Sequence, residues 1–121
     1  MDDQKWMARA LELARSAADV GEVPVGAVIV SDQGELLGEA HNSPISSNDA
    51  TAHAEVLAIR AACARANNYR LPNATLYVTL EPCSMCAGAL VHSRVGRVVI
   101  AAKEPRAGAA GSVMNLSLIH I

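Results

Sequence analysis

Residues 75–86 read Thr-Leu-Tyr-Val-Thr-Leu-Glu-Pro-Cys-Ser-Met-Cys. The first part alternates Leu and Val with Thr and Tyr, which predicts a β-strand over 74–80. The second part places Cys83 and Cys86 three residues apart, where a helix over 84–92 is predicted to begin. A strand that delivers two thiols to a helix start is a pattern for holding a metal ion, because the positive helix end favours thiolates.

The rest of the chain surrounds this unit with further helices and strands. The strand–helix–strand order predicts a parallel part of a sheet, and the early hairpin predicts an antiparallel edge. We therefore expect an α/β fold with a mixed sheet. From the N-terminus, the predicted elements are a helix from Trp6 to about Gly21, strands over 23–30 and 35–40 joined by a turn at 31–34, a polar loop over 41–50, a helix over 51–67, and, after the unit already described, a strand over 95–101. The buried stripe of the helix over 51–67 is expected at Val56, Ile59 and Cys63.

Composition limits the protein to one small domain. The chain has 121 residues, 51% hydrophobic and 18% charged, which excludes a disordered protein. Aromatic residues are only 2%, so the core must consist of aliphatic side chains and closely packed alanine. No apolar run is long enough to span a membrane, and three cysteines are too few for a disulfide framework. A reducing cytoplasm is the expected compartment.

Charge is spread unevenly along the chain. The formal net charge is −2, which does not indicate a nucleic-acid-binding protein. The excess of basic residues after position 81 is compatible with a phosphate-bearing partner, but chance scatter is an equally good explanation. The basic residues in that part are Arg94, Arg97, Lys103 and Arg106, against the single acidic residue Glu104.

A third metal ligand must come from outside the Cys-x-x-Cys pair. A redox pair would need no third ligand, and a structural zinc site would need a fourth. Cys63 lies about 15 Å along the helix from His53, so the two cannot share an ion, and Cys63 is interpreted as a core thiol. His53 is the best partner, and three protein ligands describe a catalytic zinc site. The remaining histidines are poor candidates because of their loop, helix-face and tail positions: His41, His92 and His120.

Glu55 follows His53 by two residues, at the predicted start of a helix. In a helix interior the two side chains would diverge, whereas at the first turn both can face one pocket. A carboxylate in a first helical turn is often only a helix-dipole partner. Beside a metal histidine, we interpret Glu55 as a proton carrier. The chemistry that fits is hydrolysis at an sp² carbon bearing an amine, since the His-Glu-x-x-His pattern of zinc peptidases is absent.

These residues resemble the His-x-Glu … Pro-Cys-x-x-Cys signature of the zinc-dependent cytidine deaminase superfamily. Over roughly residues 3–116, further phrases are similar to the bacterial tRNA-specific adenosine deaminases. Those phrases are Gly21-Glu22-Val23-Pro24-Val25-Gly26-Ala27-Val28, His41-Asn42, Pro44, Thr51-Ala52-His53-Ala54-Glu55, Tyr69-Arg70-Leu71, residues 75–83, Cys86-Ala87-Gly88 and Gly108-Ala109-Ala110-Gly111-Ser112.

The resemblance implies a three-layer α/β/α fold, one Zn²⁺ per chain and conversion of adenosine to inosine at the wobble position of a tRNA anticodon. It implies a homodimer. The alternatives are a deaminase of a free cytosine- or guanine-type base or nucleoside, and a non-catalytic domain stabilised by zinc. The resemblance implies that zinc is held by His53, Cys83 and Cys86 and that Glu55 transfers protons. It implies substrate contacts from Asn42, Pro44, Ala54, Ala102 and Glu104. The charge distribution, separately, predicts RNA phosphate contacts from Arg94, Arg97, Lys103 and Arg106.

The resembled family continues beyond the Gly-Ala-Ala-Gly-Ser phrase into a further strand and a long helix. Residues 117–121 do not look like that continuation. We therefore interpret 1–116 as a C-terminally truncated deaminase domain with an atypical tail at 117–121. The alternative is a naturally short member of the family. The strand over 95–101 is then expected to be exposed at the sheet edge, where it could pair with another chain.

Overall fold

The computed structural model describes residues 2–103, which form four strands and four helices. None of these helices is long and apolar enough to cross a membrane. The elements are α1 (Asp3–Asp19), β1 (Gly26–Val30), β2 (Leu36–His41), α2 (Pro44–Ser47), α3 (Ala54–Ala66), β3 (Thr75–Leu80), α4 (Ser84–Ser93) and β4 (Arg97–Ala102).

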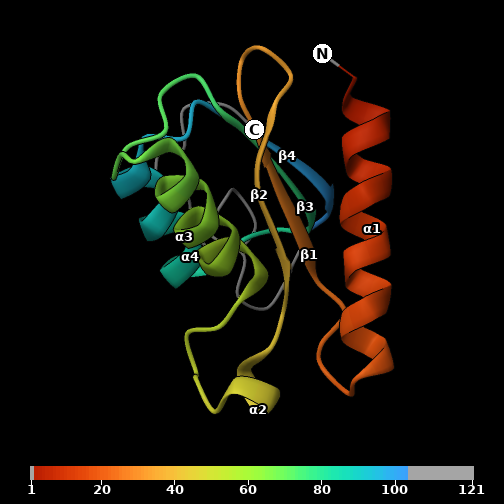
Figure 1. Cartoon of the computed structure of the whole chain (residues 1–121). Helices are drawn as coiled ribbons and strands as arrows, with labels where there is room; N and C mark the ends of the chain where they lie inside the picture. Colours follow the sequence, from red (N-terminus) through yellow and green to blue (C-terminus); the bar gives the residue numbers. More distant parts are fainter. Residues whose placement is uncertain (1, 104–121) are drawn as a thin grey trace.

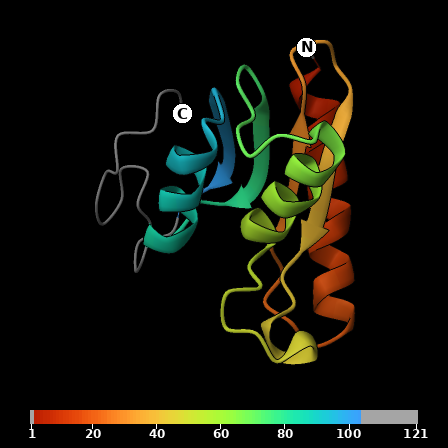
Figure 2. The ribbon, with the colours of Figure 1, turned by 60° about the vertical axis from the view of Figure 1, so that its left-hand side comes forward.

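The strands form one sheet in the order β2-β1-β3-β4. β1 is antiparallel to both β2 and β3, whereas β3 and β4 are parallel. Helix α1 covers one face, and α3 and α4 cover the other (Figure 1; Figure 2). The expected α/β/α fold with a mixed sheet is confirmed.

Small residues let the helices lie close to the sheet. A Cβ atom on Gly26 would lie 2.0 Å from the carbonyl oxygen of Ala10 in α1. A Cβ atom on Gly38 in β2 would lie 2.6 Å from the carbonyl oxygen of Ala58 in α3. The backbones of helix and sheet thus lie in direct contact at these glycines, without bulky side chains between them, as the alanine-rich composition predicts.

This close approach corrects the predicted buried stripe of α3. The stripe was expected at Val56, Ile59 and Cys63, but these three side chains are only partly buried. The fully buried positions are the small ones, since only alanine fits between α3 and the sheet. Those positions are Ala54, Ala58 and Ala62.

A charged contact holds the start of α1 against the start of β4. Asp3 accepts two hydrogen bonds from the guanidinium of Arg97, at 2.6 and 2.9 Å, and a third from the hydroxyl of Tyr77 at 2.6 Å. The hydrogen bonds from Arg97 keep the pKa of Asp3 well below its ordinary value. Residues 94 positions apart are thereby joined across the sheet.

Several element boundaries differ from the sequence-based expectation. β1 begins at Gly26 rather than at Val23, and β4 covers Arg97–Ala102 rather than 95–101. The polar loop contains the short helix α2, with Pro44 in its first turn. Helix α3 begins at Ala54, because His53 keeps an extended backbone as its N-cap residue.

The expectation for the last strand is only partly right. Within residues 2–103, β4 is the edge strand, and no strand pairs with its outer side. Val95 and Val98 are nevertheless buried in the core cluster that includes Leu90 of α4, while Ala101 and Ala102 are exposed. Residues 104–121, including the tail at 117–121, lie outside the described part of the chain.

Replacing Gly26 with alanine is expected to lower the free energy of unfolding by about 1–3 kcal/mol or more, because the new methyl group collides with the backbone of α1. Gly88→Ala is the matched control. A Cβ atom there meets nothing within 4 Å, and a helical glycine costs about 0.5–1 kcal/mol relative to alanine, so this variant is expected to be more stable. Urea denaturation of both variants measures the difference. Equal midpoints for Gly26→Ala and the parent would contradict the close approach of α1.

Candidate metal centre and active site

Two helices start beside each other at the carboxyl ends of β3 and β4. His53 is the N-cap residue of α3, and Cys83 is the N-cap residue of α4. The backbone N–H of Glu81 donates to the carbonyl oxygen of Ala102 at 2.8 Å, so both strands end at this level. Crevices at the carboxyl ends of strands are the usual ligand sites of open α/β sheets.

His53, Cys83 and Cys86 converge there, with their ligand atoms all within 4.8 Å of one another. Nδ1 of His53 lies 3.7 Å from Sγ of Cys83 and 3.5 Å from Sγ of Cys86. Tetrahedral zinc with usual bond lengths separates a nitrogen from a sulfur ligand by about 3.6 Å. The donor set and its spacing therefore fit zinc. Cys63 does not belong to this group.

The two thiols differ in their electrostatics. A hydrogen bond from Cys86, together with the backbone amides of Cys86 and Met85 and the nearby His53, lowers the pKa of Cys83 to about 5 despite partial burial. The pKa of Cys86 is raised, because Cys86 donates to Cys83 and is itself buried near Glu55. The pair thus favours one thiolate at neutral pH without metal, which suits cation binding.

Glu55 is buried beside this cluster, with only 4% of its surface exposed. Burial raises its pKa to about 7, and the nearby Cys83 adds to the increase, while His53 acts in the opposite direction. A carboxyl group with a pKa near neutrality can both accept and donate a proton. The structure thus places Glu55 where the sequence analysis expected it, at the first turn of α3 and facing the metal ligands.

The segment from β2 to α3 carries the residues that the sequence analysis expected to contact the substrate. Asn42 is buried, and its Oδ1 accepts the N–H of Ala54 at 2.7 Å. The N–H of Ser43 donates to the carbonyl oxygen of Ala52 at 3.0 Å. Asn42, Ala54 and Pro44 therefore lie in one connected segment that leads directly into His53.

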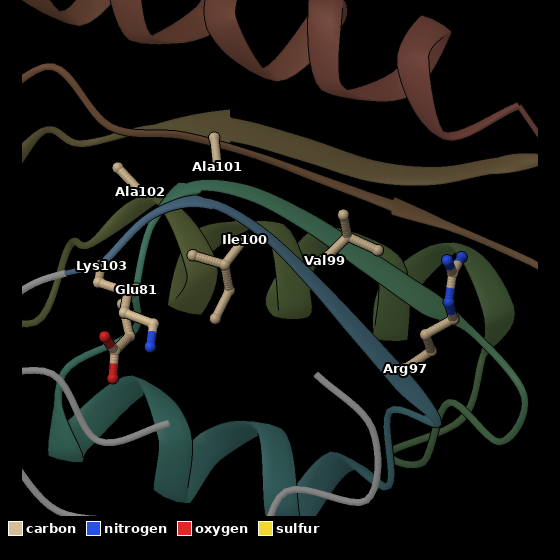
Figure 3. A pocket seen from close by; sticks show the side chains of 7 residues that line it. All are labelled: Glu81, Arg97, Val99, Ile100, Ala101, Ala102 and Lys103. Carbon is tan, nitrogen blue, oxygen red and sulfur yellow. The ribbon is translucent and has the colours of Figure 1, made fainter. Parts of the chain in front are cut away.

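A cavity of about 460 Å³ runs along β4, next to the metal centre rather than over it. Figure 3 shows Glu81 and Lys103 at the end of this cavity where β4 finishes, and Arg97 at the other end. Ala102 lines the same end as Lys103. Because Glu81 precedes Pro82-Cys83, this end of the cavity is the one nearest the metal ligands.

The four expected phosphate contacts do not form one cluster. Arg94 is the C-cap residue of α4, about 16 Å along the helix from Cys83. Arg97 is already bound by Asp3, as described above. Of the three that the structure describes, only Lys103 lies at the end of the sheet that carries the candidate metal centre. Arg106 and the expected substrate contact Glu104 lie outside the described residues.

One buried charge near the site was not singled out from the sequence. Glu22, only 5% exposed, accepts the backbone N–H groups of Ile45 at 3.3 Å and Ser46 at 2.7 Å. Burial alone would raise its pKa, but the amide hydrogen bonds outweigh burial and hold the pKa below its ordinary value. The available signal was an acidic residue between a helix end and a buried strand.

Comparisons with known proteins agree with this chemistry. Residues 1–102 match the family described as the cytidine and deoxycytidylate deaminase zinc-binding region. The tRNA-specific adenosine deaminase of Haemophilus influenzae is 54% identical over 110 residues, which cover 91% of this chain and 64% of that protein. The relative from Bacillus subtilis with the same name is 49% identical over 94% of this chain and 70% of its own length. The chain thus spans about two thirds of the length of these curated relatives.

Solved structures show the same fold. A tRNA:A34 deaminase, studied for A-to-I editing at the wobble position of transfer RNA, superposes with a TM-score of 0.86 and 47% identity over 89% of this chain and 78% of that one. Guanine deaminase from Bacillus subtilis superposes with a TM-score of 0.83 and 42% identity over 93% of this chain and 71% of that one. The chain belongs to the zinc-dependent cytidine and deoxycytidylate deaminase family, on the branch of the bacterial tRNA-specific adenosine deaminases.

Proposed function

We propose that this protein hydrolyses adenosine to inosine at the wobble position of a tRNA anticodon, releasing ammonia. The observation that carries the proposal is the buried carboxylate of Glu55 beside the three convergent ligands His53, Cys83 and Cys86. A zinc site that only stabilised the fold would have no use for that carboxylate.

His53, Cys83 and Cys86 would hold one zinc ion, bound through Nδ1 and the two sulfur atoms. When bound, zinc supplies Lewis acidity, which lowers the pKa of water in the site. The protein contributes fixed geometry. Asn42, which directly follows β2, accepts the N–H of Ala54 at the start of α3, and the N–H of Glu81, just before α4, donates to Ala102 at the end of β4.

Glu55 would carry protons during the reaction. Its carboxylate takes a proton from the attacking water, passes it to N1 of the purine ring, and delivers the second proton of that water to the departing amine. The balance is adenosine and water to inosine and ammonia. Proton transfer by a positioned group contributes about 10²–10⁴-fold to the rate.

The substrate base would lie against the segment from Asn42 to Ala54. Because Oδ1 of Asn42 accepts from Ala54, its amide nitrogen is the atom that would donate to the base. Pro44 would line the same side, and Ala102 and Glu104 would approach the flipped nucleotide and its ribose. An anticodon loop presents splayed bases, which lowers the cost of extracting one.

The similarity to guanine deaminase supports a second candidate, deamination of a free base or nucleoside. Incubation of the zinc-loaded protein with an anticodon stem-loop, and separately with adenosine, cytidine and guanine, distinguishes the two. We expect inosine in the stem-loop only. Deamination of a free base but not of the stem-loop would overturn the RNA assignment.

We further infer a homodimer that acts in the cytoplasm, where tRNA is processed, with residues 1–116 as the deaminase domain and 117–121 as an appended tail. The names of the tRNA-specific relatives support tRNA as the partner. Sedimentation of the purified protein measures its assembly state.

Elemental analysis is expected to find one zinc per chain, and Cys86→Ser is expected to lose most of it, because one of three protein ligands is removed. Cys63→Ser is the matched control, since this thiol lies apart from the ligand cluster. Zinc loss in Cys63→Ser, or full zinc content in Cys86→Ser, would contradict the ligand assignment.

Glu55→Gln is expected to keep the zinc and the fold while lowering kcat by at least about 10²-fold, since the amide cannot carry protons. Single-turnover kinetics on the stem-loop measures the effect. Glu12→Gln, which changes an exposed carboxylate on α1, is expected to have parental activity. A kcat for Glu55→Gln within tenfold of the parent would assign proton transfer to another group.

Lys103→Gln is expected to weaken stem-loop binding and to reduce the salt slope of binding by about 0.7, as the loss of one phosphate contact would. Arg94→Gln tests in the same way the phosphate contact that the charge distribution predicted for Arg94. Arg65, which pairs with Glu35 at 3.1 Å, provides the control variant Arg65→Gln. Unchanged affinity and salt slope in both Lys103→Gln and Arg94→Gln would exclude these residues from the RNA interface.

A further inference from the structure

The short helix α2 is held by a residue that lies far from it in the sequence. Its N-cap residue, Ser43, makes no side-chain capping hydrogen bond. The N–H groups of Ile45 and Ser46, which a helix start leaves without partners, donate instead to the carboxylate of Glu22. A remote buried carboxylate therefore performs the capping that Ser43 does not provide.

Little else fixes this helix to the body of the protein. None of its four residues is buried, and Ile45 is 72% exposed. Apolar packing therefore contributes little to holding α2 in place. Two hydrogen bonds to a buried carboxylate are the directional contact that can, because an ionised acceptor strengthens both bonds.

The segment anchored by Glu22 is continuous with the proposed substrate pocket. On the strand side, the N–H of Asn42 donates to the carbonyl oxygen of Val25 at 3.0 Å. On the helix side, Asn42 contacts Ala54, as described above. Figure 1 shows α2 at the end of the molecule where α3 and α4 begin.

Glu22 thus contacts the start of α2, which follows Asn42 in the proposed pocket, and it is not one of the three candidate metal ligands. It follows the end of α1, and its backbone N–H donates to the carbonyl oxygen of Ala17 at 2.9 Å, so the C-terminal turn of α1 helps to position its carboxylate. Displacement of α2 would move Pro44, the first residue of that helix, and would loosen the chain on either side of Asn42.

We propose that Glu22 is a positioning residue for substrate recognition: its buried carboxylate fixes α2, and thereby sets the places of Asn42 and Pro44 against the incoming base. The proposal rests on the proposed function, in which those two residues line the base pocket. Glu22 itself touches neither the metal ligands nor the base.

The test compares Glu22→Ala, Glu22→Gln and the parent on the anticodon stem-loop. Glu22→Ala is expected to raise KM about tenfold with kcat changed by less than about threefold and zinc content unchanged, because Glu55 and the ligands remain in place. Glu22→Gln keeps one acceptor oxygen and is expected to recover part of the loss in KM. Glu35→Ala, which removes an exposed carboxylate at the far hairpin turn, is the matched control.

Hydrogen exchange at the amides of Ile45 and Ser46 gives a second readout that needs no substrate. These amides are expected to be protected in the parent, partly protected in Glu22→Gln and fast in Glu22→Ala. If Glu22→Ala does not fold, Glu22→Gln alone still tests the proposal.

The possible failures can be told apart. A parent without stem-loop activity would overturn the proposed function, whereas unprotected amides in the parent would overturn the capping role. Increased exchange with unchanged KM would show that α2 does not set the pocket. A loss of kcat and zinc together would make Glu22 a residue of general stability and would also overturn the proposal.

Discussion

The contact between α3 and β2 decides where the metal centre can form. Gly38 leaves no space for a side chain beneath Ala58, so the axis of α3 lies close to the sheet. His53 and Glu55 occupy the start of that helix and move with it. A larger residue at the contact would lift the helix and separate its histidine from the thiols on α4.

Burial determines the pKa values of the site residues as much as residue type does. Glu55 alone would be an ordinary first-turn carboxylate, but loss of solvent raises its pKa to about 7. Cys83 and Cys86 have similar sequence surroundings, yet their pKa values shift in opposite directions because each interacts with the other. Such divergence within a cluster is typical of functional sites.

Charged side chains at the two ends of the sheet make different kinds of contact. Near the start of β4, Arg97 joins Asp3 and so stabilises the packing of α1. At the opposite end, Lys103 stands beside the cavity that approaches the metal ligands. Glu22 shows a third use of charge, since its carboxylate satisfies backbone groups of a segment that apolar packing does not hold.

The sequence by itself determined the order of the main helices and strands, the mixed sheet, and the grouping of His53 with Cys83 and Cys86. The elements follow from hydrophobic periodicity, which is local in the chain. The grouping of His53 with the two thiols follows from ligand chemistry, since a catalytic zinc site needs three protein ligands. Only the tertiary structure decided that alanine forms the buried stripe of α3, that Arg97 is engaged by Asp3, and that Glu22 caps α2. Each of these contacts joins residues that are far apart in the chain. Periodicity and motif spacing describe only neighbouring positions, so they do not predict which distant backbone group or charge a side chain will contact.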